Sequence, residues 1–298
     1  MKLATALCAL AVLVAGSSAR ANPKSGTRAG TLILFWSNSP VPSVWSVRPD
    51  GSHLRRISRT RQNCKRPSLS PDRKWVVFDG TPPGKPPLTD FDVQVMRPDG
   101  TGRRTLTKSD DREIDAQWSP DGTRISFQRW RWAEGEDWRD SWIWTMRPDG
   151  SDPRPLAQGT SARWSPDGRR LVFNRATQEG SGLYVIDADG TNVRRLLATA
   201  RLDSPTAWSP DGRKILFTRS FSDRASDVYV MNADGTGVRR LTRARGVDMS
   251  GTWSPDGSRI VFSSNRLGRT HLFVMRANGT RQHPITNSGA DDFDPRWY

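Results

Sequence analysis

Four carboxylates occupy the same position relative to a recurring tryptophan, five residues before it in the chain. They are Glu113, Asp203, Asp248 and Asp292. Carboxylate oxygens are the ligands that hard cations prefer, and they also bind basic side chains. If the four side chains surround a channel mouth, they could hold a cation or a basic segment of a partner. The interpretation that we favour is structural: they cap backbone groups or pair with nearby arginines, which are Arg129, Arg175 and Arg219.

A tryptophan-rich stretch lies between residues 128 and 141, where the sequence reads QRWRWAEGEDWRDS. Its candidate partner-binding residues are Trp130, Arg131, Trp132, Trp138 and Arg139. Exposed aromatic and arginine side chains anchor protein interfaces and make cation–π contacts, and aromatic faces can also stack on sugar rings. The alternative is a loop that folds onto itself as a small cluster. This stretch is the leading candidate for a binding site.

The residues that usually carry catalysis show no catalytic arrangement. The histidines, His53, His271 and His283, lack the spacing of a metal triad, and none lies in a nucleophile motif. Cys64 is the only cysteine after residue 21, and we expect it to be a small buried residue. The sequence therefore predicts a protein that is not an enzyme and that needs no metal or cofactor.

A repeated element must position these candidates. The phrase WSPDG begins at Trp118, Trp164, Trp208 and Trp253, and a degenerate copy, LSPDR, begins at Leu69. The tryptophans, with Trp297 as the last, recur every 44–46 residues, a period typical of propellers. Pro-Asp-Gly forms a turn because proline fixes φ and glycine accepts a positive φ. Each repeat, such as residues 204–242, reads as four antiparallel strands, named a to d in chain order.

A second turn recurs in six repeats. Its central dipeptide is Asp-Gly or Asn-Gly, at residues 50–51, 99–100, 149–150, 189–190, 234–235 and 278–279. The first repeat begins with TLILFWS, which resembles a strand b, and the chain ends with DPRWY, which matches a strand a. We therefore predict an all-β fold, a six-bladed β-propeller of four-stranded antiparallel blades. The C-terminal strand closes it by completing the N-terminal blade.

Loop length differs between the two rims of such a propeller. The a–b and c–d turns are tight and share one rim, whereas the b–c loops and d–a crossovers share the other, which we call the variable rim. Its longest loops belong to blades 2 and 3, at residues 79–92 and 128–141. Four prolines in residues 81–88 form either a polyproline segment presented to a partner or a stiff surface arm. Variable loops on a rigid scaffold usually carry function, so we place the working face on this rim, above blades 2 and 3.

The N-terminus predicts export. Met1–Ala21 combines a basic Lys2, a short apolar run and an A-x-A site that ends at Ala21. We expect cleavage after Ala21, a polar leader at residues 22–29 and the propeller at residues 30–298. No later stretch is long and apolar enough for a transmembrane segment. The sequence predicts a periplasmic or secreted monomer.

The formal net charge is +15 at pH 7. Such a charge attracts polyanions. Outside the cytoplasm these would be anionic envelope polymers, so we do not expect a nucleic-acid partner. The alternative is that the many arginines reflect the base composition of the genome.

Two segments give the chain a family resemblance. DVYVMNADGTGVRRLT, at residues 227–242, and GADDFDPRWY, at residues 289–298, resemble the repeats of TolB-like propellers, which are loosely related to WD repeats. The resemblance covers nearly the whole chain after the leader. It implies a six-bladed propeller in the cell envelope that binds other proteins. Family members with an α/β domain before the propeller differ from this chain, in which we expect the propeller directly after the leader.

The resemblance and the loops together give the expected function. We expect a non-enzymatic protein-binding or scaffold module of the cell envelope, with an envelope protein or lipoprotein as its partner. The alternative is a carbohydrate-binding or carbohydrate-cleaving propeller that uses the tryptophan-rich loop and the four carboxylates.

Overall fold

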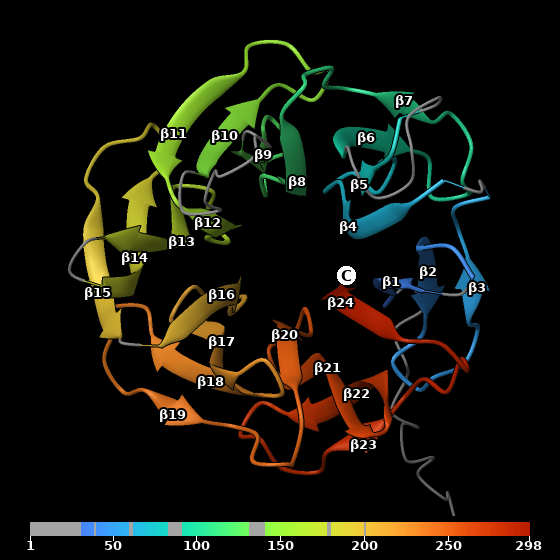
Figure 1. Ribbon diagram of the computed structural model, residues 1–298, viewed down its shortest axis with the longest axis vertical. Coiled ribbons are helices and arrows are strands. Elements are labelled where there is room, and N and C mark those ends of the chain that lie inside the picture. The colour runs from blue at the N-terminus through green and yellow to red at the C-terminus, as the bar shows by residue number, and fades with distance from the viewer. Residues whose placement is uncertain are drawn as a thin grey trace, which may run out of the picture. The chain divides into compact units, whose positions relative to one another are not determined.

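The computed structural model describes residues 31–38, 40–59, 62–82, 91–130, 141–177, 180–199 and 201–298. The predicted signal and leader, and the candidates Arg131, Trp132, Trp138 and Arg139, lie outside these residues. Residues 31–298 form one compact unit, which is built from strands arranged as a ring (Figure 1). In the part of the chain that the structure describes, no helix is long and apolar enough to cross a bilayer.

Six four-stranded antiparallel sheets make up the ring. Blade 1 contains β24 (Asp292–Trp297), β1 (Ile33–Ser37), β2 (Ser43–Val47) and β3 (Arg55–Arg56). Blade 2 contains β4 (Cys64–Leu69), β5 (Val76–Gly80), β6 (Asp92–Met96) and β7 (Arg104–Thr105). Blade 3 contains β8 (Arg112–Trp118), β9 (Ile125–Trp130), β10 (Trp142–Met146) and β11 (Arg154–Gln158). Blade 4 contains β12 (Thr160–Trp164), β13 (Arg170–Thr177), β14 (Gly180–Asp187) and β15 (Arg194–Thr199). Blade 5 contains β16 (Leu202–Trp208), β17 (Lys214–Ser222), β18 (Ala225–Asn232) and β19 (Arg239–Arg240). Blade 6 contains β20 (Asp248–Trp253), β21 (Arg259–Leu267), β22 (Arg269–Arg276) and β23 (His283–Pro284).

The two ends of the propeller meet in blade 1, as predicted. β24 pairs antiparallel with β1, in a register that places Ile33 opposite Trp297. Beyond the strands, the backbone N–H groups of Leu32 and Tyr298 each donate to the other residue's carbonyl, at 2.9 and 2.7 Å. The C-terminal strand therefore closes the ring by hydrogen bonds and leaves no unpaired inner strand.

In Figure 1, the first strands of the repeats surround the central axis, and the fourth strands form the outer edge of the ring. The first strands are β4, β8, β12, β16, β20 and β24. The WSPDG turns and the c–d turns share one edge of the ring, which we call the repeat rim. In the turn of blade 3, Ser119 Oγ donates to Asp121 and accepts from the backbone N–H of Arg124. The repeated serine therefore stabilises a turn.

The c–d glycines also let neighbouring blades approach. A Cβ atom added to Gly150 would lie 2.5 Å from the carbonyl oxygen of Leu106 in blade 2, and the φ of Gly150 is +91°. Only glycine satisfies both constraints. The recurring Asp-Gly dipeptide thus makes the turn and also sets the spacing between blades.

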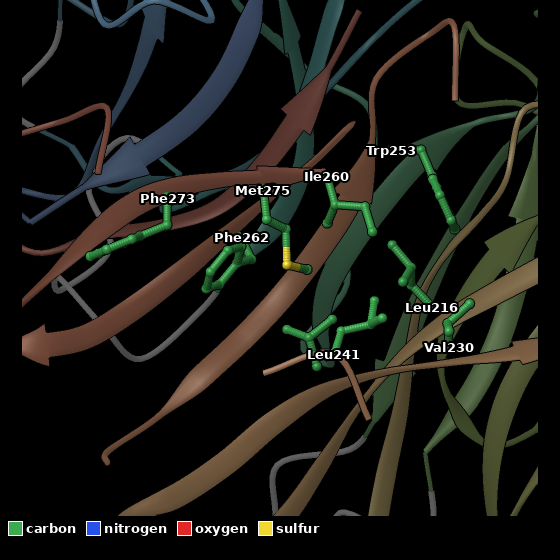
Figure 2. Close-up of a cluster of buried hydrophobic side chains, with 9 residues drawn as sticks. Leu216, Val230, Leu241, Trp253, Ile260, Phe262, Phe273 and Met275 are labelled. Atoms are coloured by element: carbon green, nitrogen blue, oxygen red, sulfur yellow. The ribbon is translucent and has the colours of Figure 1, made fainter. Parts of the chain in front are cut away.

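The core lies between adjacent blades. The six strand-b phenylalanines, Phe35, Phe78, Phe127, Phe173, Phe217 and Phe262, are all at most 2% exposed. Figure 2 shows one inter-blade cluster, in which Leu216 and Val230 of blade 5 face Trp253, Ile260 and Phe262 of blade 6. The repeat tryptophans therefore pack between blades, and the ring holds together through six similar contacts.

Candidate functional site

Each inner strand contains a β-bulge shortly before its tryptophan or its equivalent. The residue three positions before that tryptophan has a positive φ in five blades: Arg66, Asp115, Ser161, Ser250 and Asp294. Blade 5 has Pro205 there, whose ring forbids a positive φ. A left-handed non-glycine residue costs about 1 kcal/mol or more, and such strain clusters at functional sites. All six residues line one cavity in the central channel.

An ion-pair network lies across the middle of the channel. Arg163 Nη1 lies 2.6 Å from Asp115 Oδ2, and Arg296 Nη2 lies 3.7 Å from Asp115 Oδ1. Both guanidinium groups also donate to the carbonyl oxygen of Thr206, at 3.0 and 3.2 Å. Burial, together with the charge of Arg163, lowers the pKa of Arg296 below its ordinary value. One carboxylate is thus shared by two arginines.

A second part of the network joins blades 1, 2 and 6. Arg66 lies 3.0 Å from Asp79 and 3.8 Å from Asp294. Asp294 also accepts hydrogen bonds from Trp36 Nε1 at 2.8 Å and from Ser250 Oγ at 2.6 Å. Burial raises the pKa of the Asp79 carboxyl to about 6, despite the attraction of Arg66. Burial also acts on Asp294, but Arg66 and the two hydrogen bonds hold its pKa below the ordinary value.

A cavity of about 640 Å³ opens on the variable-rim side of this network. Asp115 and Asp294 lie in its lining, together with hydroxyl groups such as those of Ser204 and Ser250. Its lip over blade 5 is apolar, because Leu202 and Phe221 are 45% and 37% exposed. This end of the channel therefore combines partly buried carboxylates, hydroxyl groups and exposed apolar side chains.

A separate funnel of about 570 Å³ opens on the repeat rim. Its wall contains the repeat tryptophans Trp118, Trp164, Trp208, Trp253 and Trp297. Prolines of the adjoining turns complete the wall: Pro71, Pro120, Pro166, Pro210 and Pro255. Arg163 and Arg296 also line the funnel, and Arg296 does not line the variable-rim cavity. The network thus presents both carboxylates and arginines, Arg66 and Arg163, to the variable-rim cavity, but only arginines to the funnel.

The four predicted carboxylates do not line the channel mouth, so that placement was wrong. Glu113, Asp203, Asp248 and Asp292 are at most 1% exposed. The residues beside them in the strands, such as Ile114 and Ser204, line the cavity instead. Because side chains alternate along a strand, the carboxylates point away from the channel.

The favoured structural pairing of these carboxylates is confirmed in two blades. Glu113 pairs with Arg129, and Asp203 pairs with Arg219, both at 2.6 Å. Asp248 pairs with Arg266 at 2.7 Å, and Asp292 accepts a hydrogen bond from Ser288 at 3.0 Å. Arg175 has no such acid, because blade 4 carries Gly159 at that position. Among the described residues, no three histidine, cysteine or acidic side chains form a metal-binding group.

Trp130 is the one candidate of the tryptophan-rich loop that the structure describes. It belongs to a ladder of aromatic and basic side chains along the variable-rim ends of blades 1 to 3. Arg112 lies 5.4 Å from the Trp130 ring and 5.2 Å from the Phe91 ring. Lys65 lies 5.2 Å from Phe91 and 5.0 Å from Trp36. Burial lowers the pKa of the Lys65 ammonium. Trp130 therefore belongs to a row of partly buried side chains around the buried Phe91, and the other members of that row are absent from the sequence prediction.

The channel residues stand at fixed positions relative to the tryptophan. Asp115 and Asp294 stand three positions before it, and Arg163 and Arg296 stand one position before it. Charged residues at these positions of an inner strand must face the channel or a neighbouring blade. The bulge that turns them toward the channel carries no sequence motif.

Comparison with known proteins places the chain in a family. A family model of the TolB beta propeller domain matches residues 83–225 and 219–298. A curated relative, Protein TolB homolog of Chlorobium luteolum, is 30% identical over a region covering 33% of this chain and 31% of the relative. The match thus spans about a third of that relative's length.

The fold is shared with solved structures of other proteins. TolB from Acinetobacter baumannii is 18% identical, with a TM-score of 0.75, over 89% of this chain and 66% of that chain. An oligogalacturonate lyase in complex with manganese is 16% identical, with a TM-score of 0.58, over 86% of this chain and 74% of that chain. Likeness at such identity shows the fold alone. Because the family model matches more than half of the sequence, the chain belongs to the TolB beta-propeller family.

Proposed function

We propose that this protein is a non-enzymatic protein-binding module of the cell envelope, which binds its partner through the variable rim. The observation that carries the proposal is the 640 Å³ cavity with Leu202 and Phe221 exposed at its lip. Exposed apolar side chains beside a polar cavity are typical of interaction sites, because they gain from burial by a partner. The proposed surface runs from this lip to the ladder over blades 1 to 3, where Trp142 is 44% exposed.

The location and the partner belong to the same proposal. Met1–Ala21 has the pattern of a cleaved export signal, which supports a periplasmic or secreted protein. A partner in that compartment would be an envelope protein or a lipoprotein. The proposed surface extends the one expected from sequence, which was restricted to blades 2 and 3, toward blade 5.

The test uses two matched double variants. Leu202→Ser/Phe221→Ser removes the apolar lip of the cavity, and Val193→Ser/Val238→Ser removes side chains that are 44% and 39% exposed near the c–d turns. The immobilised proteins capture partners from an envelope extract, and each captured protein is then purified and titrated directly. We expect the lip variant to bind at least about tenfold more weakly and the control to bind like the wild type.

Two results would contradict the proposal. Equal affinity of both double variants would remove the lip from the site. Loss of binding in the Val193→Ser/Val238→Ser control alone would place the site near the repeat rim. A partner whose affinity for all three proteins falls steeply with salt would instead be an anionic envelope polymer held by net charge.

The carbohydrate alternative has lost its proposed metal ligands. Glu113 and Asp203 hold arginines inside the blades, so a metal bound there would first have to break buried ion pairs. The hydroxyl-rich cavity keeps sugar binding testable. A glycan screen with metal analysis of the purified protein addresses it, and a specific glycan that competes with the protein partner would favour this alternative.

A further inference from the structure

The repeat-rim funnel has the features of a small-molecule site that the proposed function does not use. Its volume of about 570 Å³ lies within the range of small-ligand pockets, which are mostly apolar with a few convergent polar groups. The tryptophan and proline wall supplies the apolar part. Trp208, Trp253 and Trp297 are 7–8% exposed, so each keeps an edge open to the funnel.

Polar groups converge at the funnel floor. Arg163 uses Nε for the carbonyl of Thr206 and Nη1 for Asp115 and the carbonyl of Ala162. Arg296 donates one hydrogen bond, from Nη1 to the carbonyl of Thr206. Within the described residues, Nε and Nη2 of Arg296 donate no hydrogen bond, although Nη2 lies 3.7 Å from Asp115. Since a guanidinium carries five N–H donors, the funnel floor has N–H donors that a ligand could use.

The charge of the floor selects the sign of the ligand. Asp115 is shared by both guanidinium groups and Asp294 also attracts Arg296, but both carboxylates line the variable-rim cavity and neither lines the funnel. The described residues that line the funnel include three arginines, Arg73, Arg163 and Arg296, and none is acidic. An anion in the funnel would therefore meet guanidinium groups and no carboxylate side chain, whereas a cation would meet repulsion.

We propose that the funnel binds a small organic carboxylate. Its carboxylate would accept hydrogen bonds from Arg296 and Arg163, and its apolar or aromatic body would lie against the tryptophan and proline wall. Guanidinium groups match the planar geometry of a carboxylate, which favours this head group. The site is independent of the variable rim, so it would persist if the proposed protein-binding function were wrong.

The first test compares three probes of similar shape on the wild-type protein by isothermal titration calorimetry. They are 3-phenylpropionate, the neutral 3-phenylpropan-1-ol and the cationic 3-phenylpropylamine. We expect the carboxylate to bind at least about tenfold more tightly than the alcohol, because charge-assisted hydrogen bonds to guanidinium groups are stronger than those of a neutral hydroxyl. We expect the amine not to bind. Equal affinity of the acid and the alcohol, or no binding of the acid at millimolar concentration, would overturn the proposal.

The second test assigns the head group. Arg296→Gln should weaken 3-phenylpropionate binding by about tenfold or more and leave the alcohol unaffected. Arg213→Gln is the matched control, because Arg213 is exposed beside a WSPDG turn and does not line the funnel. If Arg296→Gln unfolds the protein, Arg296→Lys takes its place in the test. Lysine keeps the positive charge, so this variant should retain part of the affinity for 3-phenylpropionate. Acid binding that is unchanged in a folded Arg296→Gln variant would exclude this site.

Discussion

The two ends of the central channel are built from the same six inner strands and differ in chemistry. At the repeat rim, five blades contribute tryptophan and five WSPDG-type turns contribute proline, so the wall is nearly uniform. At the variable rim, the residue four positions before the tryptophan differs in every blade: Lys65, Ile114, Thr160, Ser204, Met249 and Phe293.

This difference has a physical origin. The repeat-rim residues also hold the fold, since Trp253 packs between blades 5 and 6 and Ser119 fixes its turn. Their identity is therefore restricted whatever the ligand is. The variable-rim positions carry little of the core, so each blade is free to present a different side chain. We therefore expect the variable rim to determine specificity for a macromolecular partner. The nearly uniform repeat rim suits a single small ligand that lies near the channel axis.

The largest expected effect comes from opening the ring, which destroys both ends together. Deleting residues 294–298 removes most of β24 and uncovers Ile33 and Phe35 in blade 1. The loss should exceed the whole free energy of unfolding, which is about 5–15 kcal/mol for a typical domain. Tyr298→Phe is the control: it removes only the hydroxyl that accepts from the N–H of Leu69, for about 1 kcal/mol. Cooperative thermal unfolding of the truncated protein would refute ring closure by β24.

Substitutions in the core should lower the stability of the whole ring and should not affect one end of the channel more than the other. Phe217→Ala and Phe262→Ala remove fully buried rings, and each should lower the free energy of unfolding by about 3–5 kcal/mol in urea titration. Phe221→Ala, at 37% exposure, should change stability by at most about 0.5 kcal/mol and yet weaken partner binding. If Phe221→Ala destabilises the protein as much as Phe217→Ala does, the lip is part of the core.

Removing the carboxylate of Asp115 should lower the stability of the protein but strengthen ligand binding in the repeat-rim funnel. Asp115→Asn removes the carboxylate that the partly buried Arg163 and Arg296 share, which should cost about 3–5 kcal/mol of unfolding free energy. The same change makes the funnel floor more positive, so 3-phenylpropionate should bind more tightly if the variant folds. Calorimetry and urea unfolding measure the two effects. Weaker carboxylate binding by a stably folded variant would contradict the charge argument.

Titration of Asp79 should give the smaller, pH-dependent effect. Its folded-state pKa of about 6 lies above the unfolded value, so the folded protein keeps this proton to a higher pH. The free energy of unfolding should therefore fall as pH rises from about 4 to about 6, by at most about 3 kcal/mol. Asp79→Asn should flatten that decline in urea unfolding at each pH. An identical slope in both proteins would show that Asp79 is ionised throughout.

The fold could be predicted from sequence because its determinants are local and repeated. WSPDG and Asp-Gly dipeptides specify turns at fixed spacing, and DPRWY supplies the missing inner strand. The channel chemistry could not be predicted in the same way. Alternation leaves open which face of an inner strand meets the axis, and the bulge at Asp115 interrupts the count. Glu113 was therefore placed in the channel, although Asp115 is the residue that lies there.

Amide hydrogen exchange on the protein with and without its captured partner would show which end of the channel binds that partner. We expect slower exchange in residues 201–204 and 220–226, which border the variable-rim cavity, and unchanged exchange in the repeat-rim turns at 209–213 and 254–258. Protection of those turns without protection of the cavity border would contradict this expectation, because the partner would then occupy the opposite end of the channel.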